Sequence, residues 1–182
     1  MISLVLGGIR SGKSSWAEKQ FSSLNNSKPV YIATAMASDT EMAQRIQHHQ
    51  SLRKAAFDTH ELDFSSENLS DVLSQYAMQN KPVLLECMST WLGWWLCTDK
   101  SPNDQLQDIK LQTSMLLACL EQFSSDLVIV SNEVGLGLVS DNPMARMFAD
   151  ELGRLNQALA AKAHKVVLIS AGLPLILKDT QA

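Results

Sequence analysis

The sequence predicts a three-layer α/β fold, in which helices cover both faces of a mainly parallel sheet. Short apolar runs alternate with longer stretches of helical periodicity, a pattern typical of strand–helix–strand units. The apolar runs lack strict alternation, as expected of strands that are covered on both faces. A glycine-rich motif joins the first apolar run directly to the first helical stretch.

Five apolar runs are expected to be strands, and a sixth gives a weaker signal. The strands are Ile2–Leu6, Val30–Ala33, Val83–Cys87, Leu127–Ser131 and Val166–Ser170, with Phe57–Leu62 as the weaker sixth. The expected helices are Lys13–Leu24, Asp39–Ala55, Ser66–Gln79, Asp104–Phe123 and Pro143–Ala163. Pro143 suits the first turn of the last helix. The tryptophan-rich segment Trp91–Cys97 is expected to form a short helix that packs on a neighbour or on a partner.

Length and composition favour one globular domain, residues 1–182. A hydrophobic fraction of 46% is ordinary for a soluble protein. No apolar run approaches the roughly 20 residues that cross a bilayer. The N-terminal run is too short for a signal peptide and lacks a basic region before it. We therefore expect no membrane span and a cytoplasmic protein.

Charge and cysteine usage exclude further classes. The formal net charge is −4 and no basic stripe is visible, which argues against a nucleic-acid partner. The three cysteines, Cys87, Cys97 and Cys119, are odd in number and form no CxxC, which argues against a disulfide framework or a zinc site. They are expected to be reduced and mostly buried.

The segment that follows the first strand fits the P-loop pattern G-x-x-x-x-G-K-[ST]. Its residues are Gly7, Gly8, Ile9, Arg10, Ser11, Gly12, Lys13 and Ser14. Glycines let the backbone curl so that N–H groups face phosphate oxygens, and the following helix adds its dipole. Lys13 would reach the β- and γ-phosphates, and the Ser14 hydroxyl would bind Mg²⁺. The alternative is a glycine turn with an incidental lysine.

A P-loop also needs an acid near the metal, usually at the end of a neighbouring strand. Glu86 ends the strand that begins at Val83, and Glu133 follows the strand that begins at Leu127. Both acids would lie at the carboxyl edge of the sheet, where open α/β sheets bind ligands. Either one could instead be a solvated or helix-capping carboxylate.

A histidine pair in the second expected helix is the other informative feature. At about 100° per residue, His48 shares an arc with Arg45, whereas His49 falls near the apolar stripe of Met42 and Ile46. His48 is therefore the better candidate to face a ligand. Arg45 could hold a phosphate while the neutral imidazole attacks it. The alternative is an idle surface histidine on a polar helix.

The chain resembles the bifunctional adenosylcobinamide kinase / adenosylcobinamide-phosphate guanylyltransferase family of cobalamin biosynthesis. The matching stretches are GGIRSGKSSWAE, YIATA, EMAQRIQHH, VLLEC, SNEVGLGLV and ARMFADELGRLNQALAAKA. They extend over nearly the whole chain. RIQHH and NEVGxGxV in this order are far more specific than the P-loop alone.

The resemblance implies two reactions. ATP or GTP would phosphorylate the aminopropanol hydroxyl of adenosylcobinamide. GTP would then transfer GMP to adenosylcobinamide phosphate and release pyrophosphate, through a GMP-histidine intermediate. The resemblance also implies a RecA-like P-loop sheet and a trimer, to which the Trp91–Trp95 region could contribute apolar contacts.

The family's functional residues transfer to specific positions of this chain. The first histidine of RIQHH matches His48, and His49 remains the fallback. The nucleotide contacts of the YIATA segment match Thr34, Ala35 and Met36. Contacts to the guanine nucleotide are also expected from matching positions, which are Arg53, Glu61 and Glu86. The chain departs from the family pattern in CMSTWLGWWL after Glu86, in the short loop Thr98–Asn103 and in the tail LPLILKDTQA.

Two other functions compete with this interpretation. One is a single-function small-molecule kinase, in which His48 only binds phosphate. The other is a P-loop ATPase or nucleotide-switch module that drives a protein partner. Only the bifunctional enzyme would carry a covalently bound nucleotide.

Overall fold

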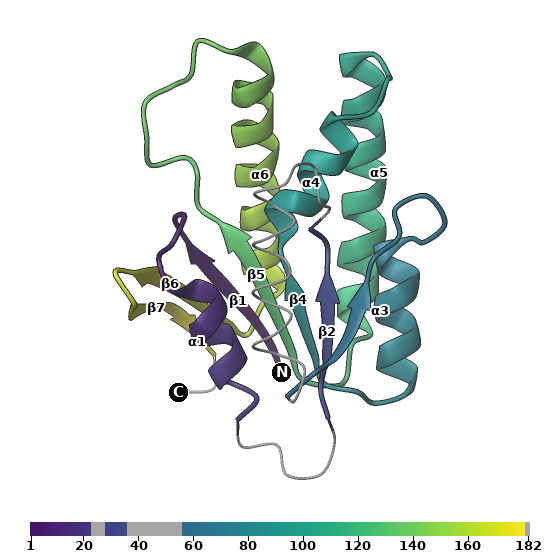
Figure 1. The fold of residues 1–182 in the computed structure, drawn as a ribbon, viewed down its shortest axis with the longest axis vertical. Coiled ribbons are helices and arrows are strands. Elements are labelled where there is room, and N and C mark those ends of the chain that lie inside the picture. The colour runs from purple at the N-terminus through teal and green to yellow at the C-terminus, as the bar shows by residue number, and fades with distance from the viewer. Residues whose placement is uncertain (23–27, 36–55, 181–182) are drawn as a thin grey trace.

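The computed structural model describes residues 1–22, 28–35 and 56–180. They form a seven-stranded sheet in the order β3-β2-β4-β5-β1-β6-β7 (Figure 1). The strands are β1 (Ile2–Gly7), β2 (Val30–Ala33), β3 (Asp58–Glu61), β4 (Val83–Glu86), β5 (Leu127–Asn132), β6 (Lys165–Ser170) and β7 (Leu173–Asp179). The helices are α1 (Lys13–Lys19), α3 (Leu69–Met78), α4 (Met88–Leu96), α5 (Pro102–Glu121) and α6 (Pro143–Lys162).

Every strand pair except β6–β7 is parallel, so the predicted mainly parallel sheet is confirmed. Each expected strand is present to within one residue at either end, including the weaker sixth, which is β3. β7 was not predicted. Pro174 interrupts its short apolar run, and a proline inside such a run argues against a strand unless the strand lies at an edge, as β7 does.

Three helices begin or end away from their expected positions, one of them α4, which begins at Met88 rather than Trp91. α1 ends at Lys19 rather than Leu24, because the N–H groups of the next three residues bond three residues back, in tight turns. α3 begins at Leu69 rather than Ser66, because the Asn68 side chain caps it by accepting from the Ser70 N–H. α5 and α6 match the expected helices to within two residues.

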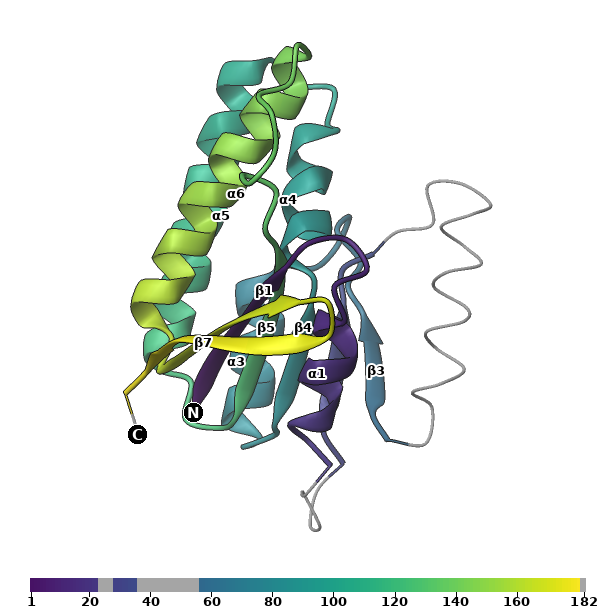
Figure 2. The same ribbon diagram turned by 90° about the vertical axis from the view of Figure 1, so that its left-hand side faces the viewer.

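The helices cover both faces of the sheet (Figure 2). On one face, Ala17 of α1 packs with Val5 and Val130. On the other, α3, α4, α5 and α6 cover a larger core that includes Leu116 and Leu152. Pro143 lies in the first turn of α6, as expected. The expected helix over 39–55 lies outside the described residues.

The tryptophan-rich segment forms the expected short helix, α4, and most of it belongs to the core. Trp91 is only 1% exposed. The Trp94 ring stacks on Phe64 with ring centroids 5.0 Å apart. The expectation that Trp91–Trp95 offers apolar contacts to a partner is therefore wrong for Trp91, because the chain's own core already covers it.

The cysteines are free, but they are not mostly buried as expected. Cys97 is exposed at the C-terminal end of α4, and Cys87 and Cys119 are half-buried. In the part of the chain that the structure describes, no helix is both long and apolar enough to cross a membrane.

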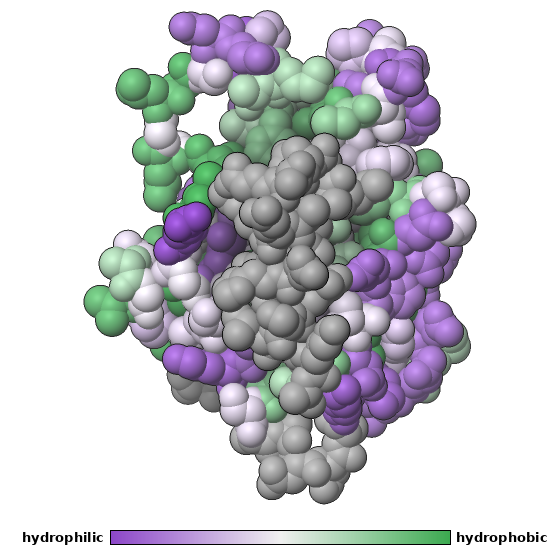
Figure 3. All heavy atoms as spheres, in the orientation of Figure 1, coloured by the Kyte–Doolittle hydropathy of each residue, from purple (hydrophilic) through white to green (hydrophobic). Residues whose placement is uncertain are grey.

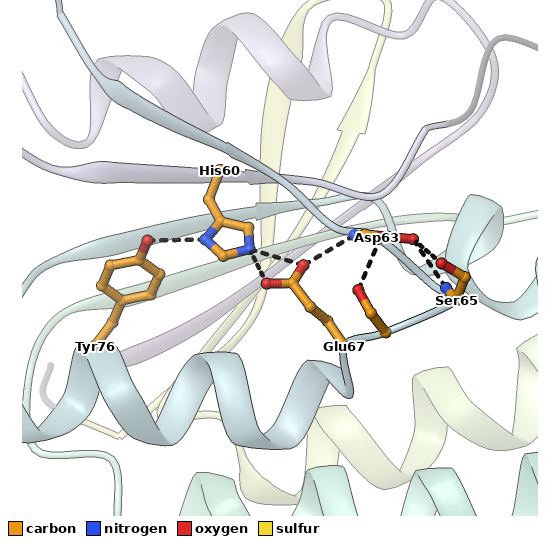
Figure 4. A network of polar contacts seen from close by, with 6 residues as sticks. His60, Asp63, Ser65, Glu67 and Tyr76 are labelled. Atoms are coloured by element: carbon orange, nitrogen blue, oxygen red, sulfur yellow. Dashed lines mark hydrogen bonds and ion pairs between the residues drawn. The ribbon is translucent and has the colours of Figure 1, made fainter.

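A polar network fixes the connection between β3 and α3 (Figure 4). His60 is hydrogen-bonded through Nδ1 to the Tyr76 hydroxyl at 2.9 Å and through Nε2 to the Glu67 carboxylate at 3.1 Å. The Asp63 backbone N–H also donates to Glu67, at 2.9 Å. That bond, followed by the one to His60, lowers the pKa of Glu67. Glu67 thus joins the strand, the loop and the helix in its ionised form.

We predict that Glu67→Ala lowers the free energy of unfolding by about 1 kcal/mol at neutral pH, because it removes hydrogen bonds to a charged acceptor. The folded-state pKa of Glu67 lies below its unfolded value. The contribution is therefore complete above the unfolded pKa, near 4.3, and is lost as the pH falls through the folded pKa. Urea unfolding at several pH values measures this, and the two proteins should converge at low pH.

Glu121→Ala is the matched control, since Glu121 forms an exposed ion pair with Lys162. Exposed pairs contribute little, so the free energy of unfolding should change much less than in Glu67→Ala. An equal loss in both variants would show that the β3–α3 network has no special role.

Candidate functional site

The P-loop runs from the end of β1 into α1, at the edge where the parallel strands end. It contains a tight turn, in which the Ser11 N–H donates to the Gly8 carbonyl at 3.2 Å. Arg10 and Gly12 have positive φ angles of 56° and 95°. A backbone that curls in this way can present several N–H groups to one anion. Ile9 lies at the exposed side of the loop.

Close approach of the backbone explains why glycines are needed at two positions. A Cβ at Gly7 would lie 2.4 Å from Ser11 Oγ and 2.7 Å from the Ile169 carbonyl oxygen. A Cβ at Gly12 would lie 3.2 Å from Gly172 Cα, and the positive φ of Gly12 already disfavours a side chain. The P-loop is therefore packed tightly against β6 and the turn that follows it.

The turn of the β6–β7 hairpin contacts the P-loop and holds it in place. Its two turn residues, Ala171 and Gly172, have φ angles of 50° and 81°. Positive φ at both central residues is the geometry of a two-residue hairpin turn. The Gly172 N–H donates to the Ser11 carbonyl at 2.8 Å. A strand pair distant in sequence thus fixes the middle of the loop.

Lys13 folds back over the loop, and its ammonium donates to the Gly8 carbonyl at 3.1 Å. Burial lowers the pKa of Lys13, and electrostatic interactions with Cys87 and Glu86 partly oppose this shift. A cation with reduced hydration beside a curled backbone favours a polyphosphate ligand, whose charge would replace the lost solvation.

The structure separates the two acids that the sequence left as alternatives. The Ser14 hydroxyl donates to Glu86 Oε1, and the Tyr31 hydroxyl donates to Glu86 Oε2 at 2.8 Å. Glu133 instead accepts from the Gly135 N–H at 2.9 Å. It lines a groove of about 410 Å³ between α6 and the β6–β7 hairpin. Of the two acids, Glu86 is the one in contact with the P-loop serine.

The pairing of Ser14 with Glu86 fits a magnesium site of the P-loop type. Mg²⁺ keeps several waters and takes one or two carboxylates together with substrate phosphates, so a hydroxyl and one carboxylate are a sufficient protein contribution. Within residues 1–22, 28–35 and 56–180, no group of three His, Cys, Asp or Glu side chains could hold a metal ion. The described residues therefore do not form a metal site made of protein ligands alone.

The other candidate nucleotide residues lie around the same edge. Thr34 is 1% exposed, and its hydroxyl accepts from the Cys87 N–H at 2.8 Å and lies 2.6 Å from Thr90 Oγ1. Its side chain thus ties the end of β2 to the start of α4. Ala35 follows it and is half-buried, and Glu61 lies exposed at the end of β3. The remaining candidates lie outside the described residues: Met36, His48, His49 and Arg53.

Two contributors to the site escaped the sequence interpretation. Tyr31 lies in an otherwise apolar run, although a buried hydroxyl there needs a partner. The Ala171–Gly172 pair lies between two apolar runs, which is a signal for a short hairpin. Neither signal reveals which distant residue the group contacts.

An exposed apolar loop lies close to this edge, between β5 and α6. Leu136, Leu138 and Val139 are each more than 80% exposed. Figure 3 shows hydrophobic surface at the upper left of the molecule, where Figure 1 places the loop between β5 and α6. Apolar side chains gathered in this way are typical of contact surfaces.

We predict that Gly7→Ala lowers the free energy of unfolding by about 1–3 kcal/mol, because the added methyl group meets a backbone carbonyl that cannot give way. Thermal unfolding should show a loss of several degrees, since about 1 kcal/mol corresponds to about 2–4 °C at this chain length. Gly8→Ala is the matched control, because a Cβ at Gly8 meets nothing within 4 Å. Equal melting temperatures for the two variants would contradict the packing described here.

Comparison with known proteins gives the fold and the family. A KaiC-like protein from Pyrococcus horikoshii superimposes with a TM-score of 0.52 at 12% identity, over 99% of this chain and 79% of that one. Flagellar accessory protein FlaH from Methanocaldococcus jannaschii gives a TM-score of 0.50 at 13% identity, over 98% and 78%. These similarities support the three-layer P-loop fold.

Sequence relatives match over nearly the full length. Bifunctional adenosylcobalamin biosynthesis protein CobU of Escherichia coli is 37% identical, over 98% of this chain and all of that protein. Its counterpart CobP of Pseudomonas aeruginosa is also 37% identical, over 98% of each chain. The family model described as cobinamide kinase / cobinamide phosphate guanyltransferase matches residues 3–177. The chain therefore belongs to the cobinamide kinase / cobinamide phosphate guanyltransferase family.

Proposed function

We propose that this enzyme phosphorylates adenosylcobinamide and then guanylylates the product. In the first step the aminopropanol hydroxyl attacks the γ-phosphorus of ATP or GTP, its proton leaves, and the nucleoside diphosphate departs. In the second, adenosylcobinamide phosphate receives GMP from GTP, giving adenosylcobinamide-GDP and pyrophosphate. The observation that carries the proposal is the contact of Ser14 with Glu86 in a P-loop whose chain matches this family over residues 3–177.

The kinase step uses charge and position rather than a protein nucleophile. Curled backbone N–H groups from Gly7 to Ser14 would hold the phosphate oxygens. Lys13 would leave the Gly8 carbonyl and bind the β- and γ-phosphates. Ser14 and Glu86 would hold Mg²⁺, which when bound neutralises charge on the transferred phosphoryl group.

The guanylyl step needs a nucleophile, for which we propose His48. Its neutral imidazole would attack the α-phosphorus of GTP, forming a P–N bond as the bond to pyrophosphate breaks. The substrate phosphate would then attack the same phosphorus, which breaks the P–N bond and releases the free imidazole. The RIQHH motif and the family membership support this role.

Further members of the nucleotide site follow from the family pattern. We propose contacts from Thr34, Ala35 and Met36 and, for the guanine nucleotide, from Arg53 and Glu61. Since the Thr34 side chain is buried, its contribution would come through the backbone. Use of ATP and GTP favours a cytoplasmic enzyme.

We also propose that the single domain of residues 1–182 assembles as a homo-oligomer, a trimer by family resemblance. The exposed apolar loop after β5 and the exposed leucines of β7 are the surfaces that favour this assembly. Gel filtration with light scattering tests it.

One labelling experiment separates the bifunctional enzyme from the two alternative functions. A single-function kinase would phosphorylate the acceptor without retaining nucleotide. A P-loop ATPase module would hydrolyse nucleotide when its protein partner is present. Incubation with α-labelled GTP and denaturing electrophoresis separates them from the bifunctional enzyme, which should retain acid-labile, base-stable label.

We predict that His48→Ala abolishes the GMP label and lowers guanylyl transfer by about a thousandfold or more, because it removes the nucleophile. Most kinase activity should remain, since Lys13 and Ser14 are untouched. In the parent enzyme, labelling should fall at acid pH, because imidazole attacks only when neutral and its ordinary pKa is about 6.5.

His49→Ala is the control for His48→Ala, and it should keep the label. A label that survives in His48→Ala contradicts the proposed nucleophile, and loss only in His49→Ala would transfer the role to that neighbour. Loss of both activities in a folded His48→Ala enzyme would indicate a shared phosphate-binding role instead.

We predict that Glu86→Gln raises the Mg²⁺ concentration for half-maximal turnover by at least about tenfold, because an amide holds the metal and its waters less strongly. Glu133→Gln should leave this concentration unchanged, since Glu133 contacts its own loop. Titration of both variants with Mg²⁺ at saturating nucleotide measures the difference. If Glu133→Gln raised the Mg²⁺ requirement and Glu86→Gln did not, Glu133 would be the acid at the metal.

A further inference from the structure

The Tyr31 hydroxyl reaches the P-loop site from β2, the strand next to the edge strand β3. Tyr31 is 4% exposed, lies on the α1 face, and packs edge-on against Phe57 with ring centroids 6.0 Å apart. It pairs in register with Leu84 of β4, so Glu86 is its diagonal neighbour on the same face. Diagonal neighbours lie within reach of an aromatic side chain. The 2.8 Å bond from Tyr31 to Glu86 is the result.

Both oxygens of the Glu86 carboxylate are held by hydroxyl donors. Ser14 donates to Oε1, from the first turn of α1, and Tyr31 donates to Oε2, from β2. If Ser14 bound a metal ion instead, the bond from Tyr31 would still restrict the rotation of the Glu86 carboxylate. Partners of this kind, one step behind a metal ligand, set its orientation and commonly change metal affinity when removed.

We propose that Tyr31 is a positioning residue, which holds the Glu86 carboxylate in the orientation required for the magnesium–nucleotide complex. The proposal rests on the proposed role of Ser14 and Glu86 at the metal. Tyr31 itself would contact neither the metal nor the nucleotide. Its hydroxyl would act through Glu86, and its ring packs in the core beside Phe57.

Tyr31→Phe tests this role, because it removes the hydroxyl and retains the ring that packs on Phe57. Calorimetry should give the same affinity for GTP as in the parent protein when EDTA removes all metal. When Mg²⁺ is titrated at fixed GTP, the concentration that gives half of the metal-dependent gain in affinity should rise about tenfold. Turnover at saturating Mg²⁺ should change much less.

Tyr76→Phe is the matched control. It also removes a hydroxyl from a hydrogen-bonded tyrosine, but that hydroxyl bonds to His60 in the β3–α3 network. The control should leave the Mg²⁺ titration unchanged. A purely structural role for the Tyr31 hydroxyl predicts lower melting temperatures in both variants and no change in either Mg²⁺ titration, and that result would overturn the proposal.

The double variant Tyr31→Phe, Glu86→Gln distinguishes action through Glu86 from an independent effect. If Tyr31 acts only through Glu86, the double variant should need no more Mg²⁺ than Glu86→Gln alone. Additive effects would overturn the proposal. If Glu86→Gln itself leaves the Mg²⁺ titration unchanged, the metal role of Glu86 fails; if it raises the requirement and Tyr31→Phe does not, only the role of Tyr31 fails.

Discussion

The carboxylate of Glu86 joins three parts of the molecule that are distant in sequence. It ends β4, accepts from Ser14 at the start of α1, and accepts from Tyr31 in β2. The backbone carbonyl of Glu86 also accepts a hydrogen bond from the Thr34 N–H, which keeps the end of β2 beside β4. Because one side chain contacts both the P-loop helix and β2, Glu86 helps to fix the position of the loop relative to the sheet.

The P-loop is held equally firmly on its other side. Gly7 leaves no room for a side chain against β6, and the Gly172 N–H of the β6–β7 hairpin binds the Ser11 carbonyl. A backbone fixed at both sides needs little reorganisation when phosphate oxygens arrive, which is the condition under which fixed dipoles act most strongly on developing charge. Lys13 remains the adjustable part, since its ammonium bonds only a carbonyl of the same loop among the described contacts.

Local patterns in the sequence predicted most of the fold and the phosphate site. Apolar runs placed six strands, and the G-x-x-x-x-G-K-S spacing placed the loop from Gly7 to Ser14 at a strand end. Tertiary contacts decided the rest. Nothing within β2 indicates that Tyr31 meets Glu86, and nothing within the tail indicates that Gly172 meets Ser11, because both contacts depend on the order of the strands.

The faces to which β4 and β5 point their side chains decide which of the two acids meets the P-loop serine. Successive side chains of a strand point to opposite faces, so residues two apart share a face. Leu84 packs on the α1 face, which places Glu86 on that face as well. Ser131 bonds to Asn156 of α6, and Glu133, two residues later, lines the groove beside α6. The P-loop serine begins α1, so only an acid on the α1 face can meet it. Strand parity, combined with knowledge of which face α1 covers, therefore selects Glu86 over Glu133, although both acids end a parallel strand at the same edge of the sheet.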